Sequence, residues 1–372
     1  MKELVEIIRA YDQAKKNAMH TVLATVVHVE GSSYRRPGAR MLVLENGLMI
    51  GAISGGCLEG DALKKAFLTF TDQATRLITY DTSNEEDASV GIQLGCEGVI
   101  QVLFEYIDAA KQNNPIEFIR KACNNRQKAV LVTMFDLKNK RNPLMGTTCL
   151  YNEYGNFESI LEETINKSIV VDAQQVITNA QTQFATYQIG EQSINGFLDY
   201  IQPPISIVIV GAGNDAIPLS KMADLLGWEV KVVDGRNTHA KQDRFISACQ
   251  VLVSKPEKVL EQIKIDDRTC FVLMTHNYQY DLEMLKALLP LNINYIGMLG
   301  PKKKLEKVLN DLATQGIEPS NGQLESIYGP TGLDLGAETA EEIASSIIAE
   351  IQAVFNKKEG SKLKLKTTQI HQ

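Results

Sequence analysis

Residues 31–61 form a segment that is rich in glycine, arginine and cysteine. The segment reads GSSYRRPGARMLVLENGLMIGAISGGCLEGD and holds seven glycines and three arginines. Glycine lets backbone amides approach a ligand closely, and an arginine guanidinium binds oxyanions through paired donors. We therefore interpret the segment as a binding loop for an anionic ligand, with contacts from Arg35, Arg36 and Arg40. The alternative is a solvated loop face, which is the commonest role of surface arginines.

Two cysteines near this segment are flanked by glycine. Cys57 follows Gly55-Gly56 where a helix is expected to begin, and Cys96 lies in QLGCEG. A helix N-terminus and nearby arginines would favour the thiolate of Cys57, and thiolate sulfur is a soft metal ligand. The alternative for both cysteines is a small buried apolar residue, the usual role of free cysteine. The predicted contacts here are Ser54, Gly55, Gly56, Cys57, Glu59 and Cys96.

A second glycine motif follows a strand-like run in the C-terminal half. Residues 211–216, GAGNDA, match G-x-G-x-x-G/A, in which glycines form a tight turn and admit a phosphate to a helix N-terminus. Asp234 ends the next expected strand, where an acidic residue would bind a ribose hydroxyl. However, Asp215 puts a negative charge at the phosphate position, and Arg236 makes the role of Asp234 ambiguous. The motif predicts a Rossmann-type fold and leaves nucleotide binding open.

His276 follows another expected strand, residues 270–275. Ligand sites in open α/β sheets lie at the carboxyl ends of parallel strands, which makes this histidine a candidate contact. A helix cap or an ordinary loop histidine is the alternative. The predicted contacts in the C-terminal half are Gly211, Gly213, Asp234, Arg236 and His276.

The composition narrows the possible classes of protein. A chain of 372 residues exceeds one ordinary core, so two domains are expected. The net charge of -7 argues against nucleic-acid binding, and no apolar run reaches the roughly 18 residues that a membrane span needs. Charges throughout the first 16 residues argue against a signal peptide. Six cysteines without a C-x-x-C pair suit a reducing cytoplasm.

An N-terminal domain of mixed α/β (α+β) type is expected over residues 1–202. Asn46-Gly47 is a strong hairpin signal between two of its strands. The pattern over residues 158–180 is weak, and no internal repeat is apparent. The expected helices are residues 2–16 and 58–70, and the expected strands are 21–30, 39–44, 48–53, 76–80, 99–106, 129–136 and 147–151.

A C-terminal domain is expected over residues 203–355, because strand-like runs there alternate with helix-like stretches. That alternation predicts βαβ units and a Rossmann-like, doubly wound parallel sheet. A last helix over residues 340–355 begins with a capping box of Thr339 and Glu342. The charged residues 356–372 lack a core pattern and are expected to be a disordered tail. The expected strands are 205–210, 229–234, 250–253, 270–275 and 294–297.

Taken together, these motifs resemble the XdhC/CoxI family, the xanthine dehydrogenase accessory proteins. The likeness covers most of the chain, and the motifs follow one order across both domains. Gly235 stands where proline is common and Glu97 where a small residue is common, but neither departure removes a proposed ligand group. The motifs are GSSYRRPGARM, GAISGGCLEGD and QLGCEG, followed by VGAGNDAIPL, VVDGR, MTHNYQYD, YIGMLGPKKK and GLDLGAETAEEIA.

The resemblance implies a chaperone of the molybdenum cofactor rather than an enzyme. Such a protein binds molybdopterin, supports its sulfuration and inserts it into a xanthine dehydrogenase-type apoenzyme. The phosphate of molybdopterin would suit the arginine–glycine loop, and a thiolate at Cys57 would contact molybdenum. We expect a cytoplasmic homodimer, with a cysteine desulfurase as a further partner. Two alternatives stay open: an NAD(P)-dependent oxidoreductase with His276 as acid/base, and a scaffold that only docks a partner.

Overall fold

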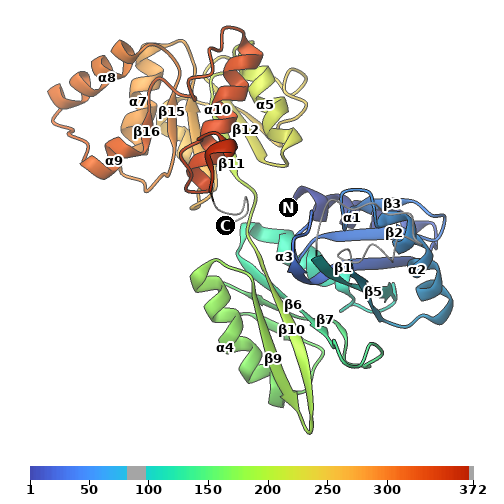
Figure 1. The fold of residues 1–372 in the computed structure, drawn as a ribbon. Helices are drawn as coiled ribbons and strands as arrows, with labels where there is room; N and C mark the ends of the chain where they lie inside the picture. The colour runs from blue at the N-terminus through green and yellow to red at the C-terminus, as the bar shows by residue number, and fades with distance from the viewer. Residues whose placement is uncertain (82–97, 368–372) are drawn as a thin grey trace. The chain divides into compact units, whose positions relative to one another are not determined.

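The structure of the chain is a computed structural model that describes residues 1–81 and 98–367. The chain divides into two compact units, Met1–Pro203 and Pro204–Gln372 (Figure 1). Each unit is described by itself below. Cys96, one of the predicted contacts, lies outside the described residues.

The first half of the N-terminal unit is an antiparallel sheet with two helices. Its five strands lie in the order β3-β2-β1-β5-β4. The hairpin predicted at Asn46-Gly47 joins β2 to β3, with Gly47 at a φ of 86°. The elements are α1 (Lys2–Lys16), β1 (Thr21–Gly31), β2 (Arg40–Leu44), β3 (Met49–Gly51), α2 (Glu59–Asp72), β4 (Arg76–Asp81) and β5 (Gly98–Ile107).

The second half of this unit is another five-stranded antiparallel sheet, in the order β8-β7-β6-β10-β9. Its first helix begins where the Asn114 side chain accepts hydrogen bonds from the amides of Ile116 and Glu117. The elements are α3 (Pro115–Cys123), the short 3-10 helix η2 (Asn124–Arg126), β6 (Ala129–Phe135), β7 (Gly146–Asn152), β8 (Phe157–Ser159), α4 (Glu163–Asn179), β9 (Gln183–Ile189) and β10 (Gln192–Ile201).

The two halves repeat one arrangement. Each half runs as a helix, three strands, a helix and two strands, and the two strand orders correspond one to one (Figure 1). The pairing register agrees at the starts of β1 and β6, because Thr21 faces Leu44 and Ile107, whereas Ala129 faces Asn152 and Ile201. It differs farther along, where β1–β5 and β6–β7 each have a register shift. The N-terminal unit is therefore a structural duplication, which corrects the expectation that the chain has no internal repeat.

Side chains on the first sheet alternate between two cores. Leu42 and Leu44 of β2 pack with α1 and α3, whereas Met41 and Val43 pack with α2. Successive side chains of a strand point to opposite faces of its sheet, so α1 and α2 cover different faces. The face covered by α1 also contacts residues of the second sheet, among them Leu131 and Ile201.

The C-terminal unit is a parallel sheet with helices on both faces. Its six strands lie in the order β13-β12-β11-β14-β15-β16, and every pair is parallel. The strands are β11 (Ser206–Val210), β12 (Glu229–Asp234), β13 (Gln250–Val253), β14 (Thr269–Leu273), β15 (Ile296–Met298) and β16 (Ile327–Tyr328). The helices are α5 (Ala216–Leu225), α6 (Pro256–Val259), η3 (Leu260–Gln262), α7 (Tyr278–Leu288), α8 (Lys302–Thr314), α9 (Asn321–Glu325), α10 (Ala340–Phe355) and η4 (Leu363–Leu365).

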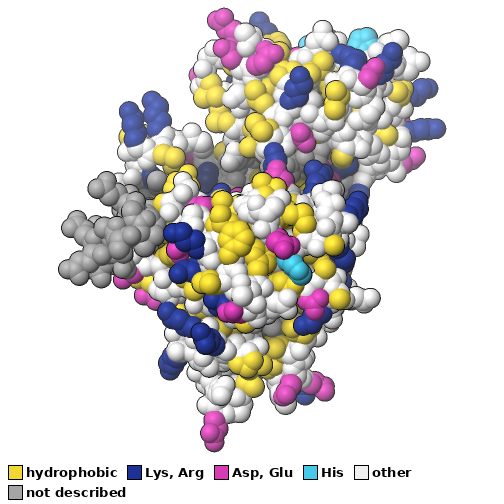
Figure 2. All heavy atoms as spheres, turned by 90° about the vertical axis from the view of Figure 1, so that its right-hand side faces the viewer, with side chains coloured by type: hydrophobic (Ala, Val, Ile, Leu, Met, Phe, Trp, Pro, Cys, Tyr) yellow, Lys and Arg dark blue, Asp and Glu magenta, His cyan; other side chains and the backbone are white. Residues whose placement is uncertain are grey.

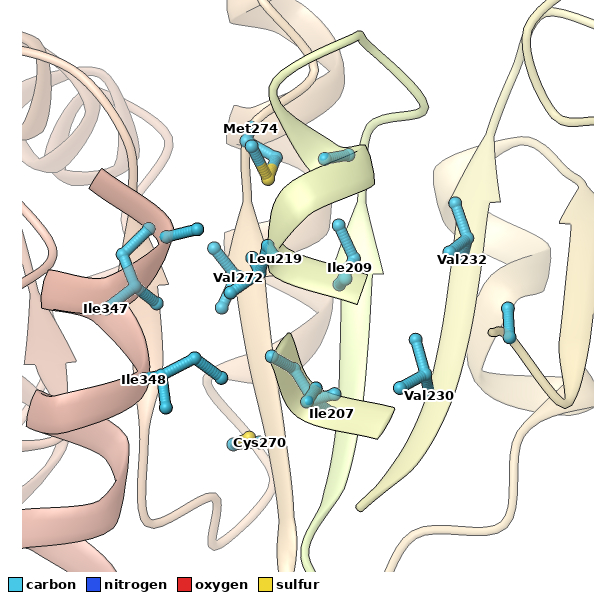
Figure 3. Packing of buried hydrophobic residues seen from close by; sticks show 14 of the residues in the cluster. Ile207, Ile209, Leu219, Val230, Val232, Cys270, Val272, Met274, Ile347 and Ile348 are labelled. Carbon is cyan, nitrogen blue, oxygen red and sulfur yellow. The ribbon is translucent and has the colours of Figure 1, made fainter. Parts of the chain in front are cut away.

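Two hydrophobic cores hold this sheet between its helices. Ile207 and Ile209 of β11 pack with Leu219 of α5 and Ile347 of α10 (Figure 3). Val208 and Val210 point the other way, toward the core that contains residues of α7 and α8. The predicted Rossmann-like, doubly wound sheet behind a separate N-terminal domain is confirmed.

Sequence reasoning missed three elements of the N-terminal unit: α3, β9 and β10. It also left residues 158–180 without a clear pattern, and these residues form α4 and part of β8. The Asn114-Pro115 pair was a usable signal for α3, since asparagine is a good N-cap and proline suits the first helical position. Gly190, at a φ of 60°, marks the turn between β9 and β10.

Candidate functional site

The loop before α2 is organised by the hydroxyl of Ser54. Its oxygen accepts hydrogen bonds from the amides of Gly56 at 3.1 Å and Leu58 at 3.0 Å, and from the thiol of Cys57 at 3.4 Å. Ser54 is buried, whereas Cys57 is half-buried at the surface of the α2 core. The loop therefore holds the thiol in a defined position beside the helix N-terminus.

Glu59 closes this loop from the first turn of α2. Its carboxylate accepts hydrogen bonds from the amide of Ser54, at 2.9 Å, and from the Ser54 hydroxyl. Burial opposes ionisation of this carboxyl group, but the hydrogen bonds from Ser54 prevail and lower the pKa of Glu59. The loop thus binds a carboxylate of its own chain.

Two glycines shape this loop in different ways. Gly56 has a φ of 111°, a conformation that side chains disfavour, and a Cβ atom there would meet open space. The ring of Tyr34 packs against Gly55. A Cβ atom added at Gly55 would lie 3.2 Å from two carbons of that ring. Tyr34 itself remains exposed. The loop therefore leaves free space beside Gly56 and presents an aromatic ring beside Gly55.

Two of the three predicted arginine contacts, Arg35 and Arg40, pair with carboxylates of the chain. Arg40 is buried and donates from Nη1 to Asp199 of β10 at 2.7 Å, and Arg35 pairs with Glu3 of α1 at 2.9 Å. Arg40 begins β2 and shares its side-chain parity with Leu42, so it points to the α1 face of the sheet. Cys57 packs on the α2 face. The structure does not bring Arg40 and Cys57 together, in contrast to the expected shared loop.

The glycine motif of the C-terminal unit forms the first β–α turn, between β11 and α5. Gly211 has a φ of 125°, and a Cβ atom there would lie 2.4 Å from the carbonyl oxygen of Met274. Only glycine fits this approach of two strand ends. The turn is also clamped by Arg244, which donates to the Ala212 carbonyl at 2.8 Å and to Oδ1 of Asn214 at 2.9 Å.

Asp215 occupies the anion position at the start of α5. Its carboxylate caps the helix through the amide of Ala216 at 3.1 Å and lies 2.9 Å from Nε2 of His276. His276 follows β14 and has a φ of 56°, which is uncommon for a residue with a side chain. Asp215 therefore lies next to both predicted contacts, Gly213 and His276. A Cβ atom added at Gly213 would collide with Oδ1 of Asp215.

Asp234 and Arg236 bind each other. Asp234 accepts two side-chain hydrogen bonds from Arg236, at 2.9 Å and 2.8 Å, and another from the amide of Ala212. Burial raises the pKa of Asp234, but the Arg236 contact and the amides outweigh it and hold that pKa below its ordinary value. The acid that would bind a ribose hydroxyl is therefore satisfied by its own chain, while Arg236 stays about half exposed.

Sequence reasoning missed the carboxylates and cations that complete these loops. Arg244 clamps the glycine turn, and Asp199 and Glu3 pair with the predicted arginines. Asp199 carried no local signal because its partner Arg40 lies 159 positions away in the chain. Glu59 was found, since it follows the glycines at the start of a helix.

The described surface shows neither a metal centre nor a membrane helix. In residues 1–81 and 98–367, no group of three or more His, Cys, Asp and Glu side chains could hold a metal ion. No helix in that part of the chain has the length and apolar character to span a bilayer. Figure 2 shows one face, on which the lysine and arginine side chains are interspersed with acidic and hydrophobic ones.

Two family descriptions match the chain. Residues 207–351 match the XdhC Rossmann domain, and residues 15–81 match the XdhC and CoxI family. The Cys57 loop lies in the second match and the Gly211 turn in the first.

Similar proteins cover nearly the whole length. A Bacillus subtilis (strain 168) protein, named as a probable xanthine dehydrogenase component, is 32% identical over 91% of this chain and 94% of its own. An Escherichia coli (strain K12) protein named "Molybdenum cofactor insertion chaperone PaoD" is 22% identical over 94% of this chain and 87% of its own. The crystal structure of a protein called a xanthine dehydrogenase, from Bacillus halodurans, has a TM-score of 0.74 and 28% identity, covering 96% of this chain and 98% of that one.

Proposed function

We propose that this chain, which belongs to the XdhC and CoxI family, is an accessory protein that binds the molybdenum cofactor and delivers it to a xanthine dehydrogenase-type enzyme. Two relatives support the proposal by their names, of which one refers to xanthine dehydrogenase and the other to a molybdenum cofactor insertion chaperone. We further propose that the chain supports sulfuration of the cofactor and inserts it into the apoenzyme.

The observation that carries the proposal is the position of Cys57. Its thiol is held by Ser54, is half-buried, and lies beside the free space at Gly56. Sulfur is a soft ligand that suits a sulfur-coordinated metal such as the one in this cofactor. We propose that the cofactor lies against the loop made by Ser54, Gly55, Gly56, Cys57 and Glu59, with Cys57 toward its metal.

The remaining predicted contacts keep narrower roles in this proposal. Arg35 and Arg36 are proposed contacts for the phosphate of the cofactor, and Cys96 is a second proposed sulfur contact. In the C-terminal unit, His276 and Arg236 are proposed contacts because both side chains are exposed beside the Gly211 turn. Gly211 and Gly213 would shape that turn, and Asp234 would position Arg236.

The geometry weighs against the alternative of an NAD(P)-dependent oxidoreductase. A dinucleotide needs the helix N-terminus for its pyrophosphate and a free acid for its ribose. Asp215 lies at the first position, and Asp234 is bound to Arg236 and to the Ala212 amide. A nicotinamide nucleotide would therefore meet two carboxylates with their hydrogen bonds already made.

Retention of the cofactor tests the proposal directly. The purified full-length chain is incubated with molybdenum cofactor and passed through a gel-filtration column, and molybdenum and pterin are measured in the protein peak. We expect both to co-elute with the protein, and the loaded protein to activate a xanthine dehydrogenase-type apoenzyme. Cofactor passed through the column alone is the control. A protein peak free of molybdenum and pterin would contradict the proposal.

The partners and the assembly belong to the same proposal. We expect a cytoplasmic homodimer that receives sulfur through a cysteine desulfurase. Light scattering of the purified protein measures the assembly, and a mass close to the 41.2 kDa of one chain would argue against the dimer.

A further inference from the structure

Each half of the N-terminal unit supplies an acidic side chain that accepts hydrogen bonds from the other half. Glu105 of β5 accepts hydrogen bonds from the Thr147 amide at 2.6 Å and the Thr147 hydroxyl at 2.9 Å. Asp199 of β10 accepts from Nη1 of Arg40 at 2.7 Å. Glu105 faces the third residue of β1 and Asp199 the third residue of β6, so these two acids are equivalent in the duplication.

Their donors face corresponding residues, although the β6–β7 register shifts between Val132 and Thr133. Arg40 faces Thr25, the fifth residue of β1, and Thr147 faces Thr133, the fifth residue of β6. The same junction between the two sheets is therefore built once with an arginine and once with a threonine. Because threonine suffices for the junction, the larger and charged Arg40 calls for another explanation.

The threonine version of the junction is complete, whereas the arginine version is not. Oγ1 of Thr133 lies 3.1 Å from Oγ1 of Thr147, which also binds Glu105. In the other half, Nε and Nη2 of Arg40 and Oγ1 of Thr25 are buried and have no hydrogen-bond partner among the described residues. Buried polar groups in proteins are nearly always paired, so three unpaired donors on one sheet face point to a bound group.

The free atoms of Arg40 form a two-pronged donor. Nε and Nη2 project parallel N–H groups from one edge of the guanidinium, which suits two oxygens of a carboxylate or phosphate. Arg236 uses these same two nitrogens to bind both oxygens of Asp234 in this chain. In Arg40, which is 2% exposed, the corresponding pair of donors is unused.

A cavity adjoins this arginine. Its volume is about 230 Å³, and it is lined by Arg40 together with Glu3, Leu4, Gly38, Asp199 and Tyr200 among others. Two ion pairs lie here, Arg40 with Asp199 and Glu3 with Arg35. A third acid, Glu105, interacts electrostatically with Arg40, and burial raises the pKa of Glu105, which favours its uncharged form.

We infer that Arg40 and Thr25 hold a phosphate group, with two of its oxygens on Nε and Nη2 of Arg40 and a third on the Thr25 hydroxyl. A third oxygen favours phosphate over a carboxylate, since Thr25 lies directly opposite Arg40 on the same sheet face. The site is on the α1 face of the sheet, whereas Cys57 packs on the α2 face. The group is either free phosphate or the phosphate of a monoester.

Isothermal titration calorimetry of the full-length chain tests this site. Two probes are titrated in separate experiments, inorganic phosphate and phenyl phosphate. We expect saturable binding at one site per chain. Equal affinities would identify the free ion as the ligand, and tighter binding of phenyl phosphate would identify a monoester. No saturable binding of either probe would overturn the inference.

Three variants assign the binding to these residues. Arg40→Lys keeps a cation beside Asp199 but loses the paired donors, so affinity should fall at least about tenfold. Thr25→Val removes only an unpaired hydroxyl, so affinity should fall while the thermal midpoint stays level or rises. Arg76→Lys is the matched control, because Arg76 also has a buried Nε without a partner but pairs with Asp72 elsewhere.

A fourth variant keeps the test valid if Arg40→Lys does not fold. Asp199→Asn can still accept the Nη1 hydrogen bond but removes the negative charge beside the proposed phosphate. Its affinity for phosphate should therefore rise several-fold. Unchanged binding in Arg40→Lys, or weaker binding in Asp199→Asn, would overturn the inference.

Discussion

The glycine loops before α2 and α5 each bind an acidic side chain of the chain itself. Glu59 accepts the Ser54 amide and hydroxyl in the N-terminal unit, and Asp215 accepts the Ala216 amide in the C-terminal unit. Both acids lie at a helix N-terminus, where backbone amides favour a negative group. At the residue scale, these loops are therefore preformed, and an anionic ligand would have to compete with a carboxylate that is already in place.

Replacing Cys57 with serine tests the role of the thiol. The hydroxyl can still donate to Ser54, so we expect the free energy of unfolding to change by no more than about 0.5 kcal/mol. Retention of the sulfurated cofactor should fall about tenfold or more, because a hard oxygen replaces a soft sulfur. Gel filtration with measurement of molybdenum gives the retention. Cys249→Ser, at an exposed cysteine of the other unit, is the control.

A different result for Cys57→Ser would contradict this role of the thiol. A serine variant with a lowered thermal midpoint and normal retention would make the thiol a packing residue and remove it from the site.

Replacing Asp215 with asparagine tests why the Rossmann unit would not take a dinucleotide. Asparagine also caps helices, so the fold should be kept. Removing the charge at the helix N-terminus should favour a pyrophosphate by about 1 kcal/mol, or about fivefold in affinity for NAD. Calorimetry measures the affinity, and Asp224→Asn, at the far end of α5, is the control. Equal affinities in both variants would contradict this role of Asp215.

At the element scale, a local signal placed the start of α10. Thr339 caps α10 and the Glu342 carboxylate accepts a hydrogen bond from the Thr339 amide, as the capping-box pattern predicts. We expect Thr339→Ala to lower the free energy of unfolding by about 1 kcal/mol, because one amide of the first turn loses its partner. Urea unfolding measures the loss. Thr339→Ser keeps the hydroxyl and should behave like the unchanged chain, so equal losses in both variants would argue against the cap.

The contact between β5 and β7 makes stability depend on pH. Burial raises the pKa of Glu105 and outweighs the Thr147 hydrogen bonds and the nearby Arg40 that lower it. A carboxyl group with a raised pKa in the folded state binds its proton more tightly there, so its ionisation costs stability as pH rises. We expect Glu105→Gln to gain stability relative to the unchanged chain as pH rises from about 4.5 toward neutrality.

Thermal unfolding of the two proteins over this pH range measures the trend. Because all other titrating groups are shared, the difference between the two midpoints isolates Glu105. A difference that stays level or shrinks with rising pH would contradict the assignment.

At the scale of the whole molecule, each unit has hydrophobic cores of its own. The clusters of Ile207 and Val208 contain only residues after Pro203, and those of Ile7, Val22, Val130 and Val27 only residues before it. We therefore expect residues 204–372 alone to fold, with one cooperative urea transition. A fragment that unfolds gradually, without a transition, would show that it depends on the rest of the chain.

The two halves of the N-terminal unit differ in the loop that forms the candidate site. The loop before α2 reads SGGCLE, whereas the equivalent loop before α4 reads SILEE and has neither glycine nor cysteine. The second half has the same strand order, so it supports the first sheet without a second copy of the Cys57 loop.

The sequence by itself determined the features that depend on near neighbours along the chain. The alternation of strands and helices after Pro203, the tight turn at Gly211, the hairpin at Gly47 and the cap at Thr339 follow from periodicity and local hydrogen bonding, and all are present. The sequence also identified the loop that holds Cys57, because glycines directly before a cysteine at a helix start form a local signal.

Only the tertiary structure decided how distant residues combine. The duplication was hidden because strand order depends on pairing partners rather than on matching residues. Arg40 shares a segment with Cys57, yet the pleat of β2 turns it to the other face of the sheet, where Asp199 holds it. Nearness in the chain fixes the spacing of side chains along a strand, but the face that each one reaches, and the charge that it meets there, depend on the packing of the two sheets.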